Sequence, residues 1–262
     1  MLTALTITAC GRVGFDAVSS DAAPSDVASL TGCNGPPRCP TFAPLCDSFE
    51  GAAIAAATWS LVENNGTVEV DGARACRGSQ SLHSQTLAIA GGTEVAAITT
   101  TSFPFARTTL FVRMYAYVPS ASDPASASQV YDLIQVENDT GAEYGVTLDD
   151  ANGAVEFQNY EPTDVTVTSS LSFPLDRWTC IEWEIDFPTS DGAADGATRI
   201  TIDGVQAPSI DPAGGLSFSP SSAPINYVEL ALGAYDSPVA LPAAEIWIDD
   251  FDVANQPIGC DD

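Results

Sequence analysis

The stretch DRWTCIEWEIDFPTSDGAADGATRITIDGV, residues 176–205, has the pattern of two β-strands joined by a polar turn. Side chains alternate over residues 179–187, with Ile181, Trp183, Ile185 and Phe187 in one set and Cys180, Glu182, Glu184 and Asp186 in the other. Successive side chains of a strand point to opposite faces, so one face is predicted to be buried and the other solvated. Small and polar residues at 190–198 favour a loop, and alternation resumes at 199–202 before the turn residues Asp203 and Gly204. The stretch therefore predicts a β-hairpin.

Other segments show the same strand pattern, and clusters of Gly, Pro, Asn and Asp separate them. They are residues 67–70, 81–87, 94–100, 108–118, 129–137, 144–148, 154–160, 165–168, 227–232 and 245–253. Many short strands without a long helix predict two packed antiparallel sheets, and not a parallel α/β fold. The fold class is therefore expected to be all-β, and 262 residues suit one large sandwich.

Two motifs resemble the concanavalin A-like lectin/glucanase superfamily, which includes laminin G-like domains. The first consists of Trp178, Ile181, Glu182, Ile200, Ile202, Asp203 and Gly204, and the second of Ile246, Trp247, Ile248, Asp249, Asp250, Phe251 and Val253. With CDSFEG at residues 46–51, the resemblance spans roughly residues 45–260. It implies an antiparallel two-sheet jelly-roll sandwich. It does not fix one activity, because this superfamily carries lectins, glycosidases, lyases and adhesive modules on a single architecture.

The charge balance excludes one class of partner. The chain has 35 Asp plus Glu residues against 8 basic residues, all of them Arg, for a formal net charge of -27. Nucleic acid is excluded as a partner because affinity for phosphate backbones depends on clustered cations. Bulk attraction to anionic polysaccharides is disfavoured for the same reason, whereas solubility, divalent-cation binding and tolerance of a salty medium are favoured.

Cysteines at 10, 33, 39, 46, 76, 180 and 260 divide into one plus six. An even set spread over a β domain predicts an oxidising compartment and disulfides. Zinc is the alternative, but the Cys spacings are wide and the only His is His83. Sequence alone permits fifteen pairings. Our hypothesis pairs Cys33 with Cys39 across the Gly-Pro-Pro turn, Cys46 with Cys260 at the chain ends, and Cys76 with Cys180.

The N-terminal region divides into two short segments ahead of the predicted domain. Residues 1–10 are apolar and end in Ile7-Thr8-Ala9-Cys10, which resembles a bacterial lipobox and implies a truncated signal segment with lipidation at Cys10. The alternative is a frayed N-terminus with an incidental Cys. Residues 11–32 are small and acidic and predict a flexible linker before a sandwich domain at 33–262. We expect an exported monomer, either in the bacterial cell envelope or extracellular, that meets a membrane only through a lipid anchor.

A ligand groove is predicted on the polar faces of three strands, and Val130, Ile134 and Val136 are expected to face the core. The groove set is Arg113, Tyr115, Tyr117, Tyr131, Gln135, Glu137, Glu182, Glu184 and Asp186. Aromatic rings beside carboxylates and amides suit sugars, since rings stack on the C–H faces of pyranoses and polar groups pair with hydroxyls. The alternative is an ordinary solvated sheet surface, which β propensity alone favours.

Two enzymatic alternatives use the same groove. Glu184-Ile185-Asp186 resembles part of the E-x-D-x-x-E strand of the glucanases, although residue 189 is Thr where the second Glu is required. A polysaccharide lyase would use Arg113, Gln135 and either Tyr115 or Tyr117, but the acidic neighbours would repel a polyuronate. We therefore expect a non-catalytic module that binds carbohydrate or another surface ligand. A lyase or hydrolase and a structural or adhesive module remain the alternatives.

A structural Ca²⁺ is the one cofactor that the resemblance implies. In related modules, carboxylates from the first and last strands meet where the termini pair, and the matching residues are Asp47, Glu50, Asp249 and Asp250. Ca²⁺ takes six to eight oxygen ligands, and a cation would relieve the repulsion between these acids. The alternative is that Asp249 and Asp250 are the exposed end of an edge strand.

Overall fold

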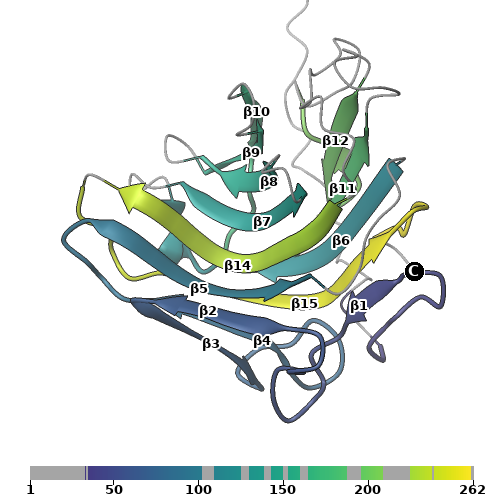
Figure 1. Ribbon diagram of the computed structural model, residues 1–262, viewed down its shortest axis with the longest axis horizontal. Coiled ribbons are helices and arrows are strands. Elements are labelled where there is room, and N and C mark those ends of the chain that lie inside the picture. Colours follow the sequence, from purple (N-terminus) through teal and green to yellow (C-terminus); the bar gives the residue numbers. More distant parts are fainter. Residues whose placement is uncertain are drawn as a thin grey trace, which may run out of the picture.

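A computed structural model provides the structure of the protein (Figure 1). It describes residues 33, 35–101, 109–124, 130–138, 143–149, 153–159, 165–187, 196–208, 225–237 and 239–260. The lipobox-like segment with Cys10 and the predicted linker lie outside the described residues. Within them, none of the helical segments has the length and apolar character needed to cross a membrane.

The described chain consists almost entirely of strands. They are β1 (Leu45–Asp47), β2 (Ser60–Asn64), β3 (Gly66–Asp71), β4 (Ser81–Thr86), β5 (Gly92–Thr100), β6 (Thr109–Tyr117), β7 (Tyr131–Asn138), β8 (Glu143–Leu148), β9 (Ala154–Asn159), β10 (Val165–Ser172), β11 (Trp178–Asp186), β12 (Ala197–Ile202), β13 (Val205–Gln206), β14 (Ile225–Ser237) and β15 (Glu245–Ala254). A 3₁₀ turn at Ser120–Ser122 follows β6. The predicted strands are all present, and β1, β2 and β13 are additional.

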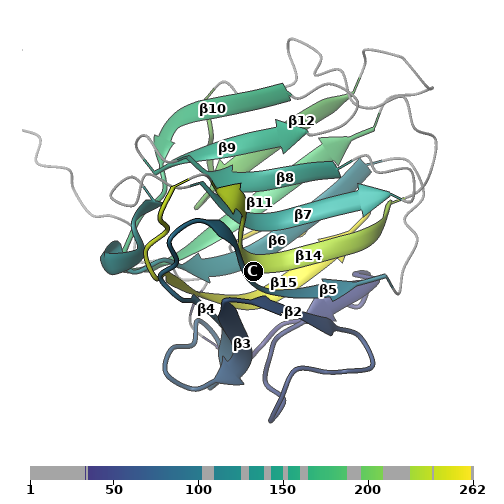
Figure 2. The same ribbon diagram turned by 60° about the vertical axis from the view of Figure 1, so that its left-hand side comes forward.

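Two antiparallel sheets face each other. Sheet A has the order β13-β12-β11-β6-β15-β4-β3, with β1 paired to β15, and sheet B has the order β10-β9-β8-β7-β14-β5-β2. Figure 2 shows sheet B in front of sheet A, and Figure 1 shows β14 and β5 bending strongly along their length. The last strand, β15, lies between β6 and β4 in the middle of sheet A. Sheet A is therefore complete only when the two ends of the domain have come together.

The predicted hairpin forms as expected. In β11 and β12, Ile181 lies opposite Ile202 and Trp183 opposite Ile200, and β6 pairs with the other edge of β11. The turn after β12 has positive φ angles at Asp203 (51°) and Gly204 (75°), as a two-residue type I′ turn requires. The Asp203 carboxylate also accepts a hydrogen bond from the backbone N–H of Cys180 at 2.8 Å, so the turn is tied back to β11.

The core lies between the sheets and uses the apolar faces that the sequence indicates. Trp183 is 1% exposed and its ring lies 6.3 Å from that of Phe157 in sheet B. Its indole N–H donates to the Thr198 hydroxyl at 2.8 Å, so its buried polar atom is satisfied. The alternate residues of β6 and the residue just after it are all buried: Leu110, Val112, Met114, Ala116 and Val118. Phe187 is partly buried and packs against the edge of this core.

Six cysteines form disulfides, as predicted, but the predicted pairing is wrong. The bonds are Cys33–Cys76, Cys39–Cys46 and Cys180–Cys260. Cys46 lies on β1, which pairs with residues 251–253 near the end of β15, whereas Cys260 lies beyond that end and is bonded to Cys180 of β11. The cysteines that the sequence places at opposite chain ends therefore do not meet.

Candidate functional site

The outer face of sheet A is closed by the two ends of the domain. Arg113 and Tyr115 of the predicted groove are 1% and 0% exposed. The Arg113 guanidinium forms an ion pair with Asp252 and donates to the backbone carbonyl of Gly259 at 3.2 Å. The Tyr115 hydroxyl donates to the backbone carbonyl of Cys260, and burial raises its pKa. These two residues therefore hold the C-terminal segment against the sheet.

The other predicted groove residues of sheet A also have protein partners. The Glu182 carboxylate accepts the backbone N–H of Gly259 at 2.8 Å, and the Glu184 carboxylate lies 2.5 Å from the Arg199 guanidinium. Asp186 accepts the hydroxyl of Thr109 at 2.6 Å, and the guanidinium of Arg74 covers the Tyr117 ring at 4.1 Å. The predicted groove residues of sheet A therefore contact other parts of the protein.

The prediction of a single groove is wrong, because β6 and β11 belong to sheet A and β7 to sheet B. Tyr131 departs from the prediction for a second reason. The pairing of β7 with β8 shifts between Asp132 and Ile134, so one extra residue, Leu133, interrupts the alternation. Tyr131 therefore points into the core, where it is 1% exposed, and Asp132 takes the outer face.

Gln135 and Glu137 do lie on the outer face of sheet B, where they join polar residues that the sequence prediction missed. We call this set the carboxylate face: Asp132, Gln135, Glu137, Glu156, Gln158, Tyr227, Glu229 and Tyr235. Strand register brings them together, because Glu229 lies opposite Gln135 and Tyr227 opposite Glu137. Gln135 is in turn opposite Gly145, which pairs with Gln158. Four strands, β14, β7, β8 and β9, therefore build one continuous polar surface.

Glu156 organises one half of the carboxylate face. It is 4% exposed, yet it has no cation in contact among the residues that the structure describes. Its carboxylate accepts hydrogen bonds from the Thr168 hydroxyl at 2.5 Å, the Thr147 hydroxyl at 3.3 Å and the side-chain amide of Gln158. Three neutral donors thus hold a buried carboxylate in one orientation.

Glu229 organises the other half. Its carboxylate accepts the Tyr227 hydroxyl at 2.8 Å and also the Tyr235 hydroxyl. The absence of a side chain at Gly233 permits this, since a Cβ there would lie 2.9 Å from the Tyr235 ring. Burial and the Glu229 charge raise the pKa of both tyrosines, so both remain neutral hydrogen-bond donors. Between Glu229 and Gly233, Ala231 adopts φ 96°, a strained value for a non-glycine residue.

Asp132 is the most strongly perturbed acid of the face. It is 8% exposed, and its Oδ1 has no hydrogen-bond partner in the described part of the chain. Desolvation, together with the charges of Glu143, Glu229 and Glu156, raises its pKa to about 8. The pKa of Glu137 is raised for the same reasons, burial and the Glu229 charge. With a pKa of about 8, Asp132 favours its protonated form at neutral pH and can present an O–H donor to the carboxylates around it.

Cations are distributed unevenly between the two outer faces. Six arginines fall within the described residues: Arg38, Arg74, Arg77, Arg113, Arg177 and Arg199. All six belong to sheet A or to segments that contact it, as shown by their partners Asp250, Trp247, Tyr115, Asp252, Asp203 and Glu184. His83 is on β4 of sheet A, between Asp71 and Glu245. Within the described chain, the carboxylate face therefore has no basic partner.

The four residues expected to bind Ca²⁺ lie near each other in the fold but have other partners. Asp47 accepts a backbone N–H and an indole N–H, each at 2.8 Å. Glu50 and Asp249 accept backbone N–H groups of the β3–β4 connection, and Asp250 lies 3.4 Å from the Arg77 guanidinium. No three of these four described carboxylates bring ligand atoms within 4.8 Å of one another. In this structure these carboxylates are held by backbone N–H groups, an indole N–H and Arg77. Calcium binding stays a prediction.

Structural comparison gives the fold its name. One similar structure is the cellulose-induced protein Cip1, with a TM-score of 0.60 and 19% identity over 82% of this chain and 99% of that chain. Another is an endo-β-1,4-glucuronan lyase from the fungus Trichoderma reesei, with a TM-score of 0.61 and 12% identity over 82% and 96%. A third is the alginate lyase vAL-1 from Chlorella virus, with a TM-score of 0.58 and 12% identity over 76% of this chain and 94% of that chain.

The fold is a jelly-roll β-sandwich. This agrees with the expected all-β class and with a concanavalin A-like architecture. At these identities the likeness shows the fold alone. Neither a protein-family model nor a curated protein sequence matches the chain.

Part of the carboxylate face had a signal in the sequence. In residues 154–160, Glu156 and Gln158 alternate with Val155 and Phe157, as a polar outer face requires. The same pattern holds for Tyr227 and Glu229. The position of Asp132 had no such signal, because simple alternation from Gln135 assigns it to the core.

We expect Asp132→Asn to stabilise the protein at alkaline pH and to change little near pH 4. The unfolded chain ionises Asp132 near its ordinary pKa of 3.8, whereas the folded chain does so at about 8. Between these values folding takes up a proton, so the free energy of unfolding falls as pH rises. Asn stays neutral, and the gain should reach about 1–3 kcal/mol at pH 9. Urea unfolding of the wild type and of Asp132→Asn at pH 4 and at pH 9 measures this gain. An equal difference in the free energy of unfolding at the two pH values would contradict the raised pKa of Asp132.

Proposed function

We propose that the carboxylate face binds a neutral polysaccharide and that binding does not require catalysis. The observation that carries the proposal is a set of desolvated carboxylates, amides and tyrosines with no cation among the described residues around them. Sugar hydroxyls are neutral donors and acceptors, so they can pair with Glu229, Glu156 and Gln135 without adding charge. The Tyr235 side chain, 46% exposed, offers a ring surface for a pyranose.

The same charge distribution disfavours a polyuronate. A chain of sugar carboxylates would meet Glu137, Glu156 and Glu229, and like charges in a partly desolvated site repel strongly. A lyase also needs a positive or amide group to neutralise the uronate beside its base. Gln135 is on this face, but the predicted partners Arg113, Tyr115 and Tyr117 lie on the other sheet. The lyase alternative therefore has less support than binding.

The similar structures support a carbohydrate ligand in general terms. Two of them are polysaccharide lyases by name, and they share this sandwich over most of their length. The substrates of those proteins are not transferred to this chain, because a shared fold does not imply a shared site. An adhesive role for the sandwich remains compatible with a surface that binds glycans.

The three disulfides indicate an oxidising compartment, and hence an exported protein. We further propose that Cys10 anchors it to a bacterial membrane through lipidation. This second proposal rests on the lipobox-like sequence and on Cys10 being the odd cysteine, since the other six are paired.

Glycan-array and affinity-electrophoresis measurements test the binding function. We expect the wild-type protein to bind one or more neutral polysaccharides at the carboxylate face, and we expect any binding of alginate or polygalacturonate elsewhere on the protein to be unaffected by Glu229→Gln. Glu229→Gln should weaken that binding about tenfold, because charge-assisted hydrogen bonds to hydroxyls become neutral ones. Glu184→Gln, which alters an ion-paired carboxylate on sheet A, is the matched control and should bind like wild type. Loss of alginate binding in Glu229→Gln, or equal losses of neutral-polysaccharide binding in the two variants, would contradict the proposal.

Glycoside hydrolysis is a second candidate, favoured by Asp132. A carboxyl with a raised pKa beside the carboxyl groups of Glu156 and Glu229 resembles the pair of acids that such enzymes combine. If this candidate holds, the neutral polysaccharide that binds best should release reducing ends with wild type. Asp132→Asn should abolish that release while leaving binding in place. Binding without any new reducing ends removes hydrolysis and leaves the binding function intact.

A further inference from the structure

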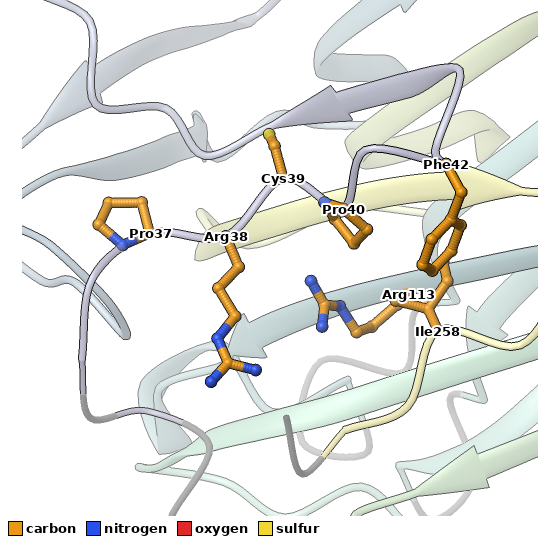
Figure 3. Close-up of a pocket in the computed structure, with 7 residues that line it drawn as sticks. All are labelled: Pro37, Arg38, Cys39, Pro40, Phe42, Arg113 and Ile258. Atoms are coloured by element: carbon orange, nitrogen blue, oxygen red, sulfur yellow. The ribbon is translucent and has the colours of Figure 1, made fainter.

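A pocket of about 520 Å³ lies on the other side of the molecule, between the N-terminal segment and the C-terminal segment. Its walls are formed by Pro37, Arg38, Pro40, Phe42, Arg113 and Ile258. Figure 3 shows the guanidinium groups of Arg38 and Arg113 directed into the same space, with the Phe42 ring at its edge. In a chain with net charge -27, two cations that converge on one pocket create a local region of positive electrostatic potential.

Arg113 is only partly satisfied by the protein. It is 1% exposed and is held by Asp252 and by the carbonyl of Gly259, but its Nε has no hydrogen-bond acceptor in the described part of the chain. A buried N–H of a charged group without an acceptor costs free energy, so an acceptor that reaches it would be stabilising. Arg113 is thus a preoriented donor at the wall of the pocket.

Arg38 supplies a second cation, which interacts electrostatically with Asp250 but forms no close ion pair among the described residues. Its backbone is fixed, because its N–H donates to Asp250 at 3.2 Å and the neighbouring Cys39 is bonded to Cys46. Its guanidinium is not within 4 Å of any carboxylate in the described residues. Like charges side by side repel, and an anion between them removes that repulsion.

The charge balance limits the ligand to one negative charge. Arg38 and Arg113 supply two positive charges, and Asp252 neutralises one of them. Asp250 faces the same region and interacts with both arginines, but the charge of its ion-pair partner Arg77 offsets its own. A monoanion therefore completes the balance, whereas a phosphate dianion would add an excess negative charge in a strongly acidic protein. Phe42, 41% exposed, and Ile258 provide apolar surface for the body that bears the anion.

We propose that this pocket binds a carboxylate carried on a compact ring, with the carboxylate between Arg38 and Arg113 and the ring against Phe42. Planar guanidinium groups match the planar carboxylate, and charge-assisted hydrogen bonds of this kind are among the stronger ones in proteins. The site is separate from the carboxylate face and does not depend on the proposed function. The ring can belong to a free small carboxylate or to a uronic acid residue of a polymer.

Methyl and aromatic NMR titrations of the whole protein test the proposal. The probes are benzoate, its neutral analogue benzamide, galacturonate and oligogalacturonate. Benzoate or galacturonate should shift the signals of Ile258 and Phe42, and benzamide should not. Tighter binding of the oligomer than of the monosaccharide would assign the site to a polymer, and tighter binding of benzoate would assign it to a free carboxylate. Absence of binding by every carboxylate probe, or equal binding of benzamide, overturns the proposal.

Arg38→Gln is the decisive variant, because Arg38 is exposed and the buried Arg113 could not be changed without affecting folding. It should weaken benzoate binding about tenfold. Arg199→Gln removes an arginine that is paired with Glu184 outside the pocket and should bind like wild type. Unchanged benzoate binding by Arg38→Gln, or an equal loss with Arg199→Gln, would overturn the assignment to this pocket.

Discussion

The apolar layer shared by sheets A and B is the constraint on which the rest of the structure depends. Each strand gives one face to this layer, as Trp183 and Phe157 do from opposite sheets. Polar side chains are then left with two outer faces and the loops. Burial of apolar surface drives the packing of the sheets. The face that a polar side chain of a strand occupies therefore follows from whether its position alternates in step with the buried residues of that strand. A single extra residue in a strand is enough to move a side chain from one environment to the other.

The acidic side chains of the two outer faces are stabilised in different ways. On sheet A, acids are matched with arginines or backbone N–H groups, and the paired chain ends and disulfides close the surface. On sheet B, Glu156 and Glu229 are held by neutral donors alone, and the raised pKa of Asp132 favours its protonated form at neutral pH. Desolvated acids without cations beside them lower the free energy of unfolding. Groups of this kind are found most often at functional sites.

Much of the fold could be predicted from local alternation, and much of the site could not. The hairpin of β11 and β12 was predictable because its apolar residues recur at every second position. Tyr131 and Asp132 were not, because the register shift at Leu133 depends on the pairing of β7 with its neighbours. The disulfides required knowledge of strand order, since β15 lies in the middle of sheet A. Alternation identifies the face of a residue, but only the assembled sheets show which faces are joined.

A crystal structure with a bound neutral oligosaccharide, taken from the polysaccharide that binds best, tests the central claim most directly. The sugar is predicted to lie across β14, β7, β8 and β9, with hydroxyls on the carboxylates of Glu229 and Glu156 and a ring against Tyr235. An oligosaccharide bound on sheet A with the carboxylate face empty would contradict the assignment of the site.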